Sequence, residues 1–374
     1  MSVNAKSFLI VGGGVGGMSA AISLRQCGAD VELIDVDPQW RALGAGMTIT
    51  GPTLRAFDRL GLLDSVREKG YLSDRTKFFS KDGVFQRENL APSLEDGLPQ
   101  AGGILRPDLH AIFSARVLEL GAKVRLGITI TDIAQDDDGV TVRFSDGGRG
   151  RYDAVVGADG FGSATRGMIL PDAPRARFTG QGCWRLLADR PAHVTSPEIY
   201  FGPDYKVGVN PCSPDKMYLF ANVKMPGNPH VPDGELVERM RALLAPIGGT
   251  IAGLREGIGP DSAINYRPLE AILIPLPWHK GRVGLIGDAV HSTTPHLASG
   301  AGLSVEDGLL VGQMLAGAQD VEAAWRAFGQ RRWERSRMVV ENSVLIGQLE
   351  QEGGHDHRIA QIMGESVIAL SQPV

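Results

Sequence analysis

Apolar runs and glycine-rich breaks alternate along the first sixty residues of the chain. Residues 7–11 form a continuous run of β-forming residues, typical of a parallel strand that is covered on both faces. Glycines interrupt the run at 12–17, and residues 18–27 then have helical composition. A second apolar run at 31–34 ends at Asp35. The pattern predicts a strand–helix–strand unit with a right-handed crossover.

In the middle of the chain, apolar and polar residues alternate, which is typical of half-buried antiparallel strands. Turns at 136–139 and 146–148 separate the alternating runs. The acidic triplet in the first turn could suggest a cation site, but a solvated hairpin turn is the better interpretation. We therefore expect a small antiparallel meander and then a buried strand, with strands over 124–134, 140–144 and 152–156.

A second domain is indicated between residues 175 and 275, which are rich in proline and scattered aromatic residues. Short alternating runs at 198–201 and 216–220 predict an antiparallel sheet there. The chain then returns to a buried strand, a helix and a long charged helix with an apolar stripe, at 281–287, 300–315 and 325–351.

Composition narrows the possible functions. The 374 residues are about two and a half times the ~150 residues of a typical domain, so we expect two domains. The 38 basic and 43 acidic residues give a net charge of −5 without a basic face, which argues against a nucleic-acid partner. The three cysteines have no metal-like spacing, and no cationic segment precedes an apolar core near the start. We expect a cytoplasmic protein, monomeric or homodimeric, without stable membrane association.

Glycine is unusually frequent, with 49 residues, and the five glycines among residues 12–17 explain part of the excess. They form a G-x-G-x-x-G pattern between the predicted strand and helix. Gly12 allows the tight turn, Gly14 lets the backbone approach a pyrophosphate, and Gly17 lets helix and strand pack closely. Asp35 lies 21 residues after Gly14, where a carboxylate can bind a ribose diol. The unit predicts dinucleotide binding, but it does not distinguish FAD from NAD.

Two aspartates follow later apolar strands. Asp159 lies in the segment A-D-G-F-G-S-A-T-R at 158–166, and Asp288 lies in G-D-A-V-H at 287–291. One aspartate after a strand is often only a helix cap. Two of them in a chain with a glycine fingerprint indicate a ligand site at the carboxyl edge of the parallel sheet.

The ordered set of these three motifs resembles the class A flavoprotein aromatic hydroxylases. These p-hydroxybenzoate hydroxylase-like FAD-dependent monooxygenases include salicylate and 6-hydroxynicotinate hydroxylases. The resemblance spans roughly residues 7–340 and includes G-A-G-M at 44–47, L-G-L at 60–62 and L-R-P-D-L at 105–109. The set is specific for the family but not for a substrate.

The resemblance implies an α/β fold with a Rossmann-like, glutathione reductase-type FAD-binding domain built on a parallel sheet. It further implies an antiparallel β-sheet domain for the substrate and a long C-terminal helix. The expected boundaries are 1–75, 100–175 and 276–325 for the FAD-binding domain, 76–99 and 176–275 for the substrate domain, and 326–374 for a C-terminal helical segment.

The resemblance also implies cofactor-binding residues. The glycines of the first motif would hold the FAD pyrophosphate, and Asp35 the adenosine ribose. Asp288 would hydrogen-bond the ribityl chain, and Asp159 would serve both FAD and a transient NADH or NADPH. Arg106 would lie near the phosphates, unless it is only a surface arginine at a helix start. The full expected set is Gly12, Gly14, Val15, Gly17, Asp35, Arg41, Arg106, Asp159, Asp288, Gly300, Ala301 and Gly302.

The loop before the helix at 300–315 would face the pyrimidine edge of the flavin. Its amides would favour the negative charge of the reduced ring. The family often has Gly-Gln-Gly where this chain has Ala-Ser-Gly at 298–300, which leaves the shape of the loop open.

The expected catalytic residues are Arg185, Pro295 and His291. Arg185 belongs to a W-R pair and could bind a substrate carboxylate or phenolate, or else form a structural salt bridge. A metal at His291 and His296 is not expected, because neither has a cysteine or acidic partner at ligand spacing. The pair His355 and His357 is more consistent with a solvated tail than with metal ligands. The tyrosines of the second domain are more often core than catalytic residues: Tyr200, Tyr205, Tyr218 and Tyr266.

The expected reaction is hydroxylation of a small electron-rich aromatic or N-heteroaromatic substrate, phenolic or carboxylated, by FAD, O₂ and NADH or NADPH. The resemblance implies a flavin C4a-hydroperoxide as the oxygen donor. An FAD-dependent oxidase or reductase of the same fold is the alternative. A binding protein similar to the GDP-dissociation inhibitors would keep the glycine loop, but it would not explain the intact segments around Asp159 and Asp288.

Overall fold

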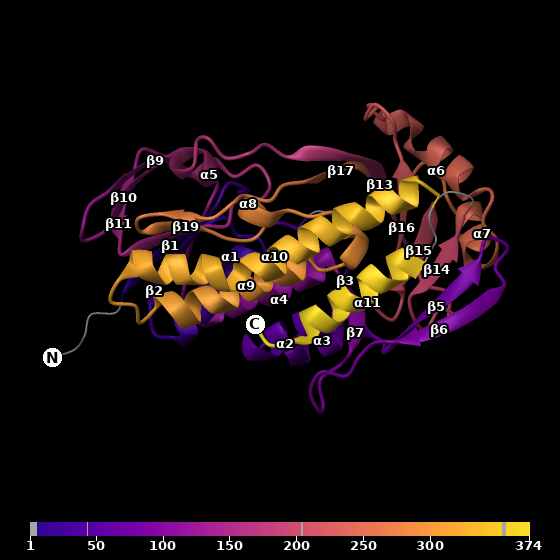
Figure 1. The fold of residues 1–374 in the computed structure, drawn as a ribbon, viewed down its shortest axis with the longest axis horizontal. Coiled ribbons are helices and arrows are strands. Elements are labelled where there is room, and N and C mark those ends of the chain that lie inside the picture. Colours follow the sequence, from indigo (N-terminus) through magenta and orange to yellow (C-terminus); the bar gives the residue numbers. More distant parts are fainter. Residues whose placement is uncertain (1–5, 43, 203–204, 354–356) are drawn as a thin grey trace.

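The computed structural model describes residues 6–42, 44–202, 205–353 and 357–374, so His355 lies outside the described part of the chain. The molecule has two sheet regions side by side, with the longest helix running along both (Figure 1). None of the helices in the described ranges is both long and apolar enough to cross a membrane.

A six-stranded sheet forms the core of the first region, in the order β18-β19-β12-β1-β2-β8. Four of the five neighbouring pairs are parallel, and only the edge strand β18 pairs antiparallel. The predicted apolar run is the central strand β1, whose residues after Ser7 are all buried. The strands are β1 (Ser7–Val11), β2 (Asp30–Asp35), β8 (Lys123–Leu126), β12 (Ala154–Gly157), β18 (His279–Lys280) and β19 (Val283–Leu285).

Two helices, α1 (Val15–Gln26) and α9 (Gly300–Leu315), pack in parallel at unusually close range. A Cβ on Gly308 would lie 2.5 Å from the Ala20 nitrogen, so only glycine fits there. A Cβ on Gly16 would lie 3.3 Å from the Ser304 side chain, which brings the first turns of the two helices together. Both positive helix ends therefore lie at one edge of the sheet.

The predicted meander is present, with strands β9 (Ile130–Gln135) and β10 (Val140–Phe144) and a third strand, β11 (Arg149–Tyr152), that the pattern did not predict. The buried strand expected over 152–156 is β12, which begins at Ala154. The single strand expected over 124–134 is wrong, because Gly127 (φ +73°) turns the chain between β8 and β9. Both strands have alternating apolar residues, so the pattern alone does not show the break. Asp136 pairs with Arg151 in the solvated hairpin turn.

The second region is a seven-stranded sheet in the order β17-β13-β16-β15-β14-β5-β6. It is antiparallel apart from the β14–β5 pair. Its pairing puts Arg185 opposite Phe220 on one face and Trp184 opposite Ala221 on the other. The strands are β5 (Arg75–Ser80), β6 (Phe85–Leu90), β13 (Arg177–Asp189), β14 (Glu198–Phe201), β15 (Lys206–Pro211), β16 (Lys216–Lys224) and β17 (Ile264–Ala271).

Helices cover the remaining surfaces. The long helix α10 contacts α9 at one end and β13 near the other, so it spans both sheets. The pattern predicted α9 at its observed bounds and most of α10. The other elements are α2 (Gly51–Arg59), α3 (Leu63–Lys69), α4 (Arg106–Glu119), α5 (Ala164–Ile169), α6 (Leu236–Leu244), α7 (Gly249–Glu256), α8 (Asp288–His291), α10 (Val321–Gln351), α11 (His357–Ser371), β3 (Gly46–Thr50), β4 (Tyr71–Leu72) and β7 (Ala101–Leu105).

Candidate functional site

The three sequence motifs meet at the carboxyl edge of the parallel sheet, where β1, β12 and β19 end. Gly12 has φ +109°, and a Cβ there would lie 2.4 Å from the Ala158 carbonyl oxygen. The Ser304 hydroxyl of α9 lies 2.8 Å from where a Cβ of Gly287 would be. Segments about 140 residues apart in the sequence are therefore packed at van der Waals distance around one site.

The glycines of the first motif have three separate roles. Gly12 makes the turn against Ala158. Gly17 packs the helix onto the strand, since a Cβ there would lie 1.9 Å from the Gly12 carbonyl oxygen. Gly14 begins α1, and a Cβ there would have no neighbour within 4 Å among the described residues. Its open side is where a phosphate-bearing ligand can approach the backbone.

This division predicts opposite outcomes for two matched variants. Gly14 has φ −75°, which alanine adopts without strain, so Gly14→Ala should keep the wild-type melting temperature but weaken dinucleotide binding by tenfold or more. Gly17→Ala should lower the melting temperature, because its methyl group collides with the Gly12 carbonyl. Thermal unfolding and cofactor titration of both variants test the assignment. Equal loss of stability in both would contradict it.

Asp35 ends β2 beside the glycine loop. Its Oδ2 accepts the Gly13 N–H at 2.6 Å and its Oδ1 accepts the Asp37 N–H at 2.7 Å. Arg41 pairs with Asp37 at 3.5 Å, and its side chain is mostly exposed. Asp35 therefore lies where the sequence predicts it, whereas the observed contact of Arg41 is with its own turn.

The Asp159 carboxylate holds the loop that follows β12. Its oxygens accept hydrogen bonds from the Ser163 hydroxyl at 2.5 Å and from the Thr165 N–H at 2.9 Å. Arg166 donates to the Ala289 carbonyl at 2.8 Å, so it ties this loop to the segment that contains Asp288. These bonds show a capping role for Asp159, and its contact with a cofactor stays a prediction.

Arg106 and Asp288 are both solvent-exposed, yet each is desolvated by surrounding protein. Burial lowers the pKa of Arg106, and burial raises the pKa of Asp288. Exposure combined with desolvation indicates groups in a recessed part of the surface, which we call the cleft. Each charge also acts on the pKa of the other, so the two side chains face the same space.

The G-A-G segment shapes the backbone next to Arg106. The Arg106 N–H donates to the Ala45 carbonyl at 3.2 Å. Gly44 has φ +112°, and a Cβ there would lie 3.1 Å from Cδ of Arg106. A side chain at position 44 would therefore crowd Arg106, and the cofactor contact of Arg106, exposed at the start of α4, stays a prediction.

The loop before α9 differs from the family pattern at a strained position. Ala298 has φ +51°, a left-handed conformation that costs an L residue about 1–2 kcal/mol. The side chain of Ser299 does not cap α9, and the first turn of the helix is Gly300, Ala301 and Gly302. The backbone amides of this turn thus stay available to an anionic ligand edge. Pro295 lies in the same loop and is half-buried.

His291 lies behind the cleft. Its ring is fully buried, and Nε2 is 2.7 Å from Oδ2 of Asp307. The same oxygen accepts the Gly287 N–H at 2.9 Å, next to Asp288. This placement favours a positioning role for His291, because its ring has no solvent-accessible surface.

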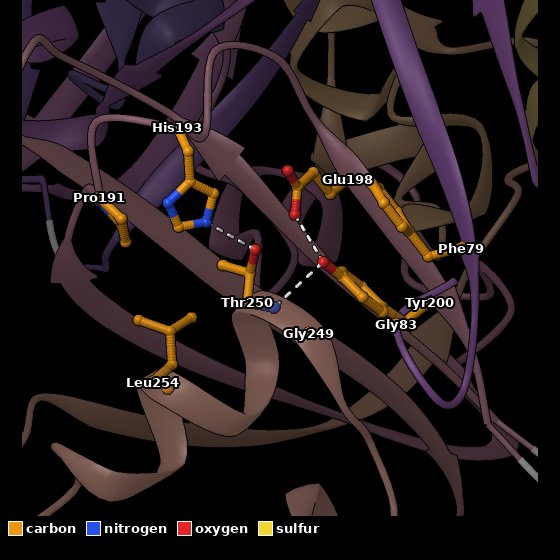
Figure 2. Close-up of a pocket in the computed structure, with 10 residues that line it drawn as sticks. Phe79, Gly83, Pro191, His193, Glu198, Tyr200, Gly249, Thr250 and Leu254 are labelled. Carbon is orange, nitrogen blue, oxygen red and sulfur yellow. Dashed lines mark hydrogen bonds between the residues drawn. The ribbon is translucent and has the colours of Figure 1, made fainter. Parts of the chain in front are cut away.

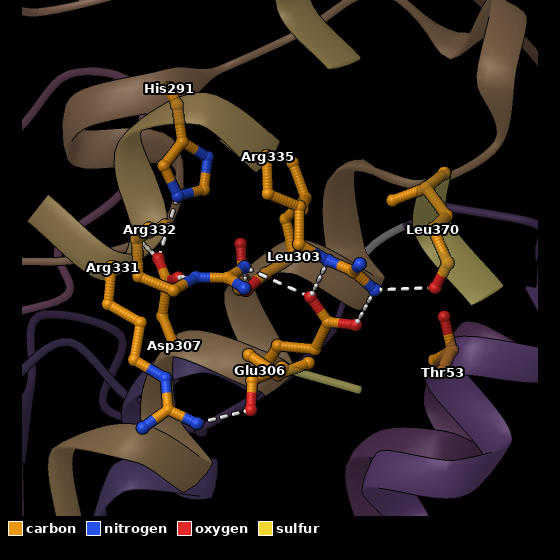
Figure 3. A network of polar contacts seen from close by, with 12 residues as sticks. Thr53, His291, Leu303, Glu306, Asp307, Arg331, Arg332, Arg335 and Leu370 are labelled. Atoms are coloured by element: carbon orange, nitrogen blue, oxygen red, sulfur yellow. Dashed lines mark hydrogen bonds and ion pairs between the residues drawn. The ribbon is translucent and has the colours of Figure 1, made fainter. Parts of the chain in front are cut away.

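A buried ionic network that the sequence reasoning missed surrounds Asp307 (Figure 3). Arg332 of α10 donates from Nε to Asp307 at 2.6 Å and pairs with Glu306 at 3.0 Å. Glu306 also binds Arg335, which donates to the Leu370 carbonyl of α11. The network joins the G-D-A segment to three helices. Acidic residues at positions 306 and 307 in an otherwise apolar helix are the sequence signal that could have revealed it.

Arg185 lies on the inner face of the seven-stranded sheet, opposite Phe220. Tyr218 and Phe220 project from the same face, with ring centroids 5.9 Å apart. The hydroxyl of Tyr218 is 2.7 Å from that of Thr48, and burial raises the pKa of Tyr218. The charge of Arg185, after burial, is the next largest influence that lowers the pKa of Arg106, so the two guanidinium groups are close enough to interact electrostatically.

A separate pocket of about 580 Å³ lies between β14 and α7 (Figure 2). Tyr200 donates to Glu198 at 2.7 Å and accepts the Thr250 N–H at 3.4 Å, while His193 contacts the Thr250 hydroxyl at 3.1 Å. Strand pairing puts Tyr200 on the face opposite to Arg185. The sheet therefore separates this pocket from the cleft. Within the described residues, no group of three or more His, Cys, Asp or Glu side chains could hold a metal.

Comparison with known proteins agrees with this geometry. The FAD binding domain family matches residues 6–182 and 274–343, which is more than half of the chain. The chain belongs to this family. The two matched segments contain the three motifs and leave out most of the seven-stranded sheet. The match decides between FAD and NAD as the resident dinucleotide in favour of FAD.

The chain is similar to two relatives of known activity and to one solved structure. The chain is 31% identical over 355 residues to the aurachin C monooxygenase/isomerase of Stigmatella aurantiaca, covering 92% of this chain and 89% of the relative. It is 30% identical over 349 residues to 2-heptyl-3-hydroxy-4(1H)-quinolone synthase of Pseudomonas aeruginosa (strain UCBPP-PA14), with the same coverage. HpxO of Klebsiella pneumoniae, complexed with FAD and uric acid, shares the fold with a TM-score of 0.83 and 24% identity over 98% of this chain and 93% of that one.

The expected family and fold class are confirmed by these matches. The described residues also fit FAD on their own evidence. The open side of Gly14, the paired N-termini of α1 and α9, and the desolvated charges of Arg106 and Asp288 provide the donors and the carboxylate that such a cofactor needs. The roles of individual residues and the domain boundaries remain predictions.

Proposed function

We propose that this FAD-dependent monooxygenase hydroxylates a small anionic aromatic or N-heteroaromatic ring, with O₂ and NADH or NADPH as co-substrates. Family membership and the monooxygenase relatives support the reaction class. One relative is a 2-heptyl-3-hydroxy-4(1H)-quinolone synthase, and HpxO is solved with uric acid, so cyclic nitrogen-containing molecules are associated with similar proteins.

The observation that supports an anionic substrate is the position of the Arg185 guanidinium. It is only half-buried, and within the described ranges it has no hydrogen-bond or ion-pair partner, which disfavours a structural salt bridge. The aromatic rings of Phe220 and Tyr218 share its face of the sheet. A cation between aromatic side chains suits a flat ring that bears a carboxylate or a phenolate.

These positions indicate what the cofactor and the surrounding residues would each contribute to the reaction. Bound FAD, reduced by NADH or NADPH, supplies the activation of O₂ and the transfer of one oxygen atom to the ring. Arg185 would bind the substrate anion and keep a phenolic oxygen ionised, which enriches the ring in electrons. The amides of the first turn of α9 would favour negative charge at the cofactor edge. The two sheets would limit the access of water to the reacting ring.

Replacing Arg185 tests this assignment. Arg185→Ala should retain FAD but raise the substrate KM by roughly 10- to 100-fold, since a hydrogen bond to a charged group contributes about 1.5–3 kcal/mol. The measurement is NAD(P)H oxidation stimulated by a panel of aromatic acids and hydroxylated N-heterocycles. Arg177→Ala, an exposed arginine on the same strand, is the matched control and should behave as wild type. A wild-type substrate response in Arg185→Ala would discard the role.

An FAD-dependent oxidase or reductase is the second candidate. The observation that favours it is the loop at Ala298, where a strained alanine stands at a position that is often glycine in the family. Product analysis distinguishes the two. A hydroxylated product in amounts matching NAD(P)H consumed supports the monooxygenase, whereas hydrogen peroxide alone supports the oxidase.

A further inference from the structure

The turn after β2 holds Trp40 in a conformation that is rare for a bulky residue. Its φ is +46°, in the left-handed region. The Asp37 carboxylate shapes the turn by accepting the N–H groups of Gln39 at 3.0 Å and Arg41 at 3.1 Å, which lowers the pKa of Asp37. Such local strain persists where the surroundings over-determine a conformation, often at ligand clamps.

The Trp40 side chain reaches over the middle of the glycine motif. Its indole N–H donates to the Gly13 carbonyl at 3.0 Å, and a Cβ on Gly13 would lie 2.3 Å from that nitrogen. The N–H of Gly13 donates in turn to the Asp35 carboxylate at 2.6 Å. Trp40 and Asp35 therefore hold the same residue of the loop from its carbonyl and its amide sides.

A second ring and an apolar side chain extend this surface. The His110 imidazole of α4 lies edge-on to the indole, with centroids 5.5 Å apart and an interplanar angle of 88°. Burial lowers the pKa of His110, which favours the neutral form of the ring. Val36, between Asp35 and the turn, is 70% exposed. Uncharged aromatic and apolar surface beside a carboxylate suits a nucleoside, with a base for the rings and a ribose diol for the acid.

We propose that Trp40 forms the adenosine-side wall of the FAD site. The inference rests on the proposed function only for the identity of the cofactor. It divides the site into two halves: an adenosine half at Asp35, Trp40 and His110, and a flavin half at Asp288 and the first turn of α9. The halves can be tested separately, because FMN carries the flavin and one phosphate but no adenosine.

The experiment is a titration of apoprotein with FAD and with FMN, followed by flavin absorbance and tryptophan fluorescence. Trp40→Ala should raise the Kd for FAD by about tenfold, the order expected for one base–aromatic contact, and should leave the Kd for FMN within about twofold. Trp40→Phe should recover most of the FAD affinity. Trp40→Gly relieves the positive φ and repeats the test if the alanine variant misfolds. Trp333→Phe, which removes a different tryptophan, should keep both affinities.

Two results would overturn the proposal: an unchanged Kd for FAD in Trp40→Ala and Trp40→Gly, or an equal loss of FAD and FMN affinity, which would indicate that Trp40 only maintains the loop. A failure of the proposed function looks different. Wild-type protein that binds neither flavin would refute the cofactor and this inference together, whereas FAD binding without substrate hydroxylation would refute only the reaction.

Discussion

Asp288→Ala should strongly weaken FAD binding while the protein still folds. The Asp288 carboxylate is solvent-exposed, has no hydrogen-bond partner among the described residues, and lies where burial raises its pKa. A desolvated carboxylate without a partner contributes little to the stability of the fold, but it can accept hydrogen bonds from a ligand hydroxyl. Loss of a hydrogen bond to a charged group, at about 1.5–3 kcal/mol, should raise the Kd roughly 10- to 100-fold. Purified variant protein should lack the yellow colour of a flavoprotein.

The control for this prediction is a carboxylate that has no contact with the cleft. Asp64→Ala removes a fully exposed carboxylate from α3 and should leave FAD binding unchanged. Asp288→Asn keeps the shape and a carbonyl acceptor, so its affinity should lie between those of wild type and Asp288→Ala. Asp288→Ala protein that retains FAD through purification, with a wild-type Kd, would remove Asp288 from the site.

The scaffold of the site could be predicted from the sequence because it depends on local patterns. The apolar run at β1 and the glycines at 12–17 specify a strand, a turn and a helix within twenty residues. The positions where strands end were harder to predict. Gly127 ends β8, but a glycine inside an alternating pattern is equally compatible with a bulge, and only the Ile128 bond to Asp35 shows that the chain turns there.

The supporting residues could not be predicted, because their partners are distant in sequence. In the sequence, Trp40 is an aromatic residue in a predicted loop. Only the structure shows that its indole N–H donates to the carbonyl of Gly13, 27 residues earlier. His291 looks like part of a catalytic motif, but its ring faces Asp307 inside the protein. In both cases residue type and spacing locate the region correctly. Only the fold decides which side chains face the cleft and which hold those side chains in place.

The largest stability effect is expected at Asp307, where α9, α10 and the G-D-A segment meet. Asp307 and Arg332 are both completely buried, and Asp307 accepts hydrogen bonds from Arg332 and Gly287. Among the described residues, Asp307→Ala would leave Arg332 with one ion-pair partner, Glu306, and a hydrogen bond to the Leu303 carbonyl, and it would remove the acceptor that positions Gly287. Breaking a buried pair by removing one partner costs about 3–5 kcal/mol, a large share of the stability of most proteins. Urea denaturation of the apoprotein measures the loss.

A matched surface variant and a double variant sharpen this prediction. Arg337→Met removes an exposed arginine of α10 that pairs with Glu334 and Glu341, and should cost at most about 1 kcal/mol. Asp307→Leu combined with Arg332→Met replaces both buried charges by apolar groups. This double variant should be more stable than Asp307→Ala, because no charge is then left without its partner at this position.

The pH dependence of unfolding tests whether the ionised carboxylate of Asp307 is the cause of this stabilisation. Burial alone would raise the pKa of Asp307, but the charges of His291 and Arg332 outweigh it, and the pKa lies below its usual value. The native protein therefore binds fewer protons here than the unfolded chain does. The stabilisation is present above the unfolded pKa of about 3.9 and is lost as the pH falls through the lower native value. Asp307→Asn should thus be less stable than wild type near neutral pH, and the gap should narrow in acid. A gap that is constant from neutral to acidic pH would show that packing, and not charge, makes Asp307 important.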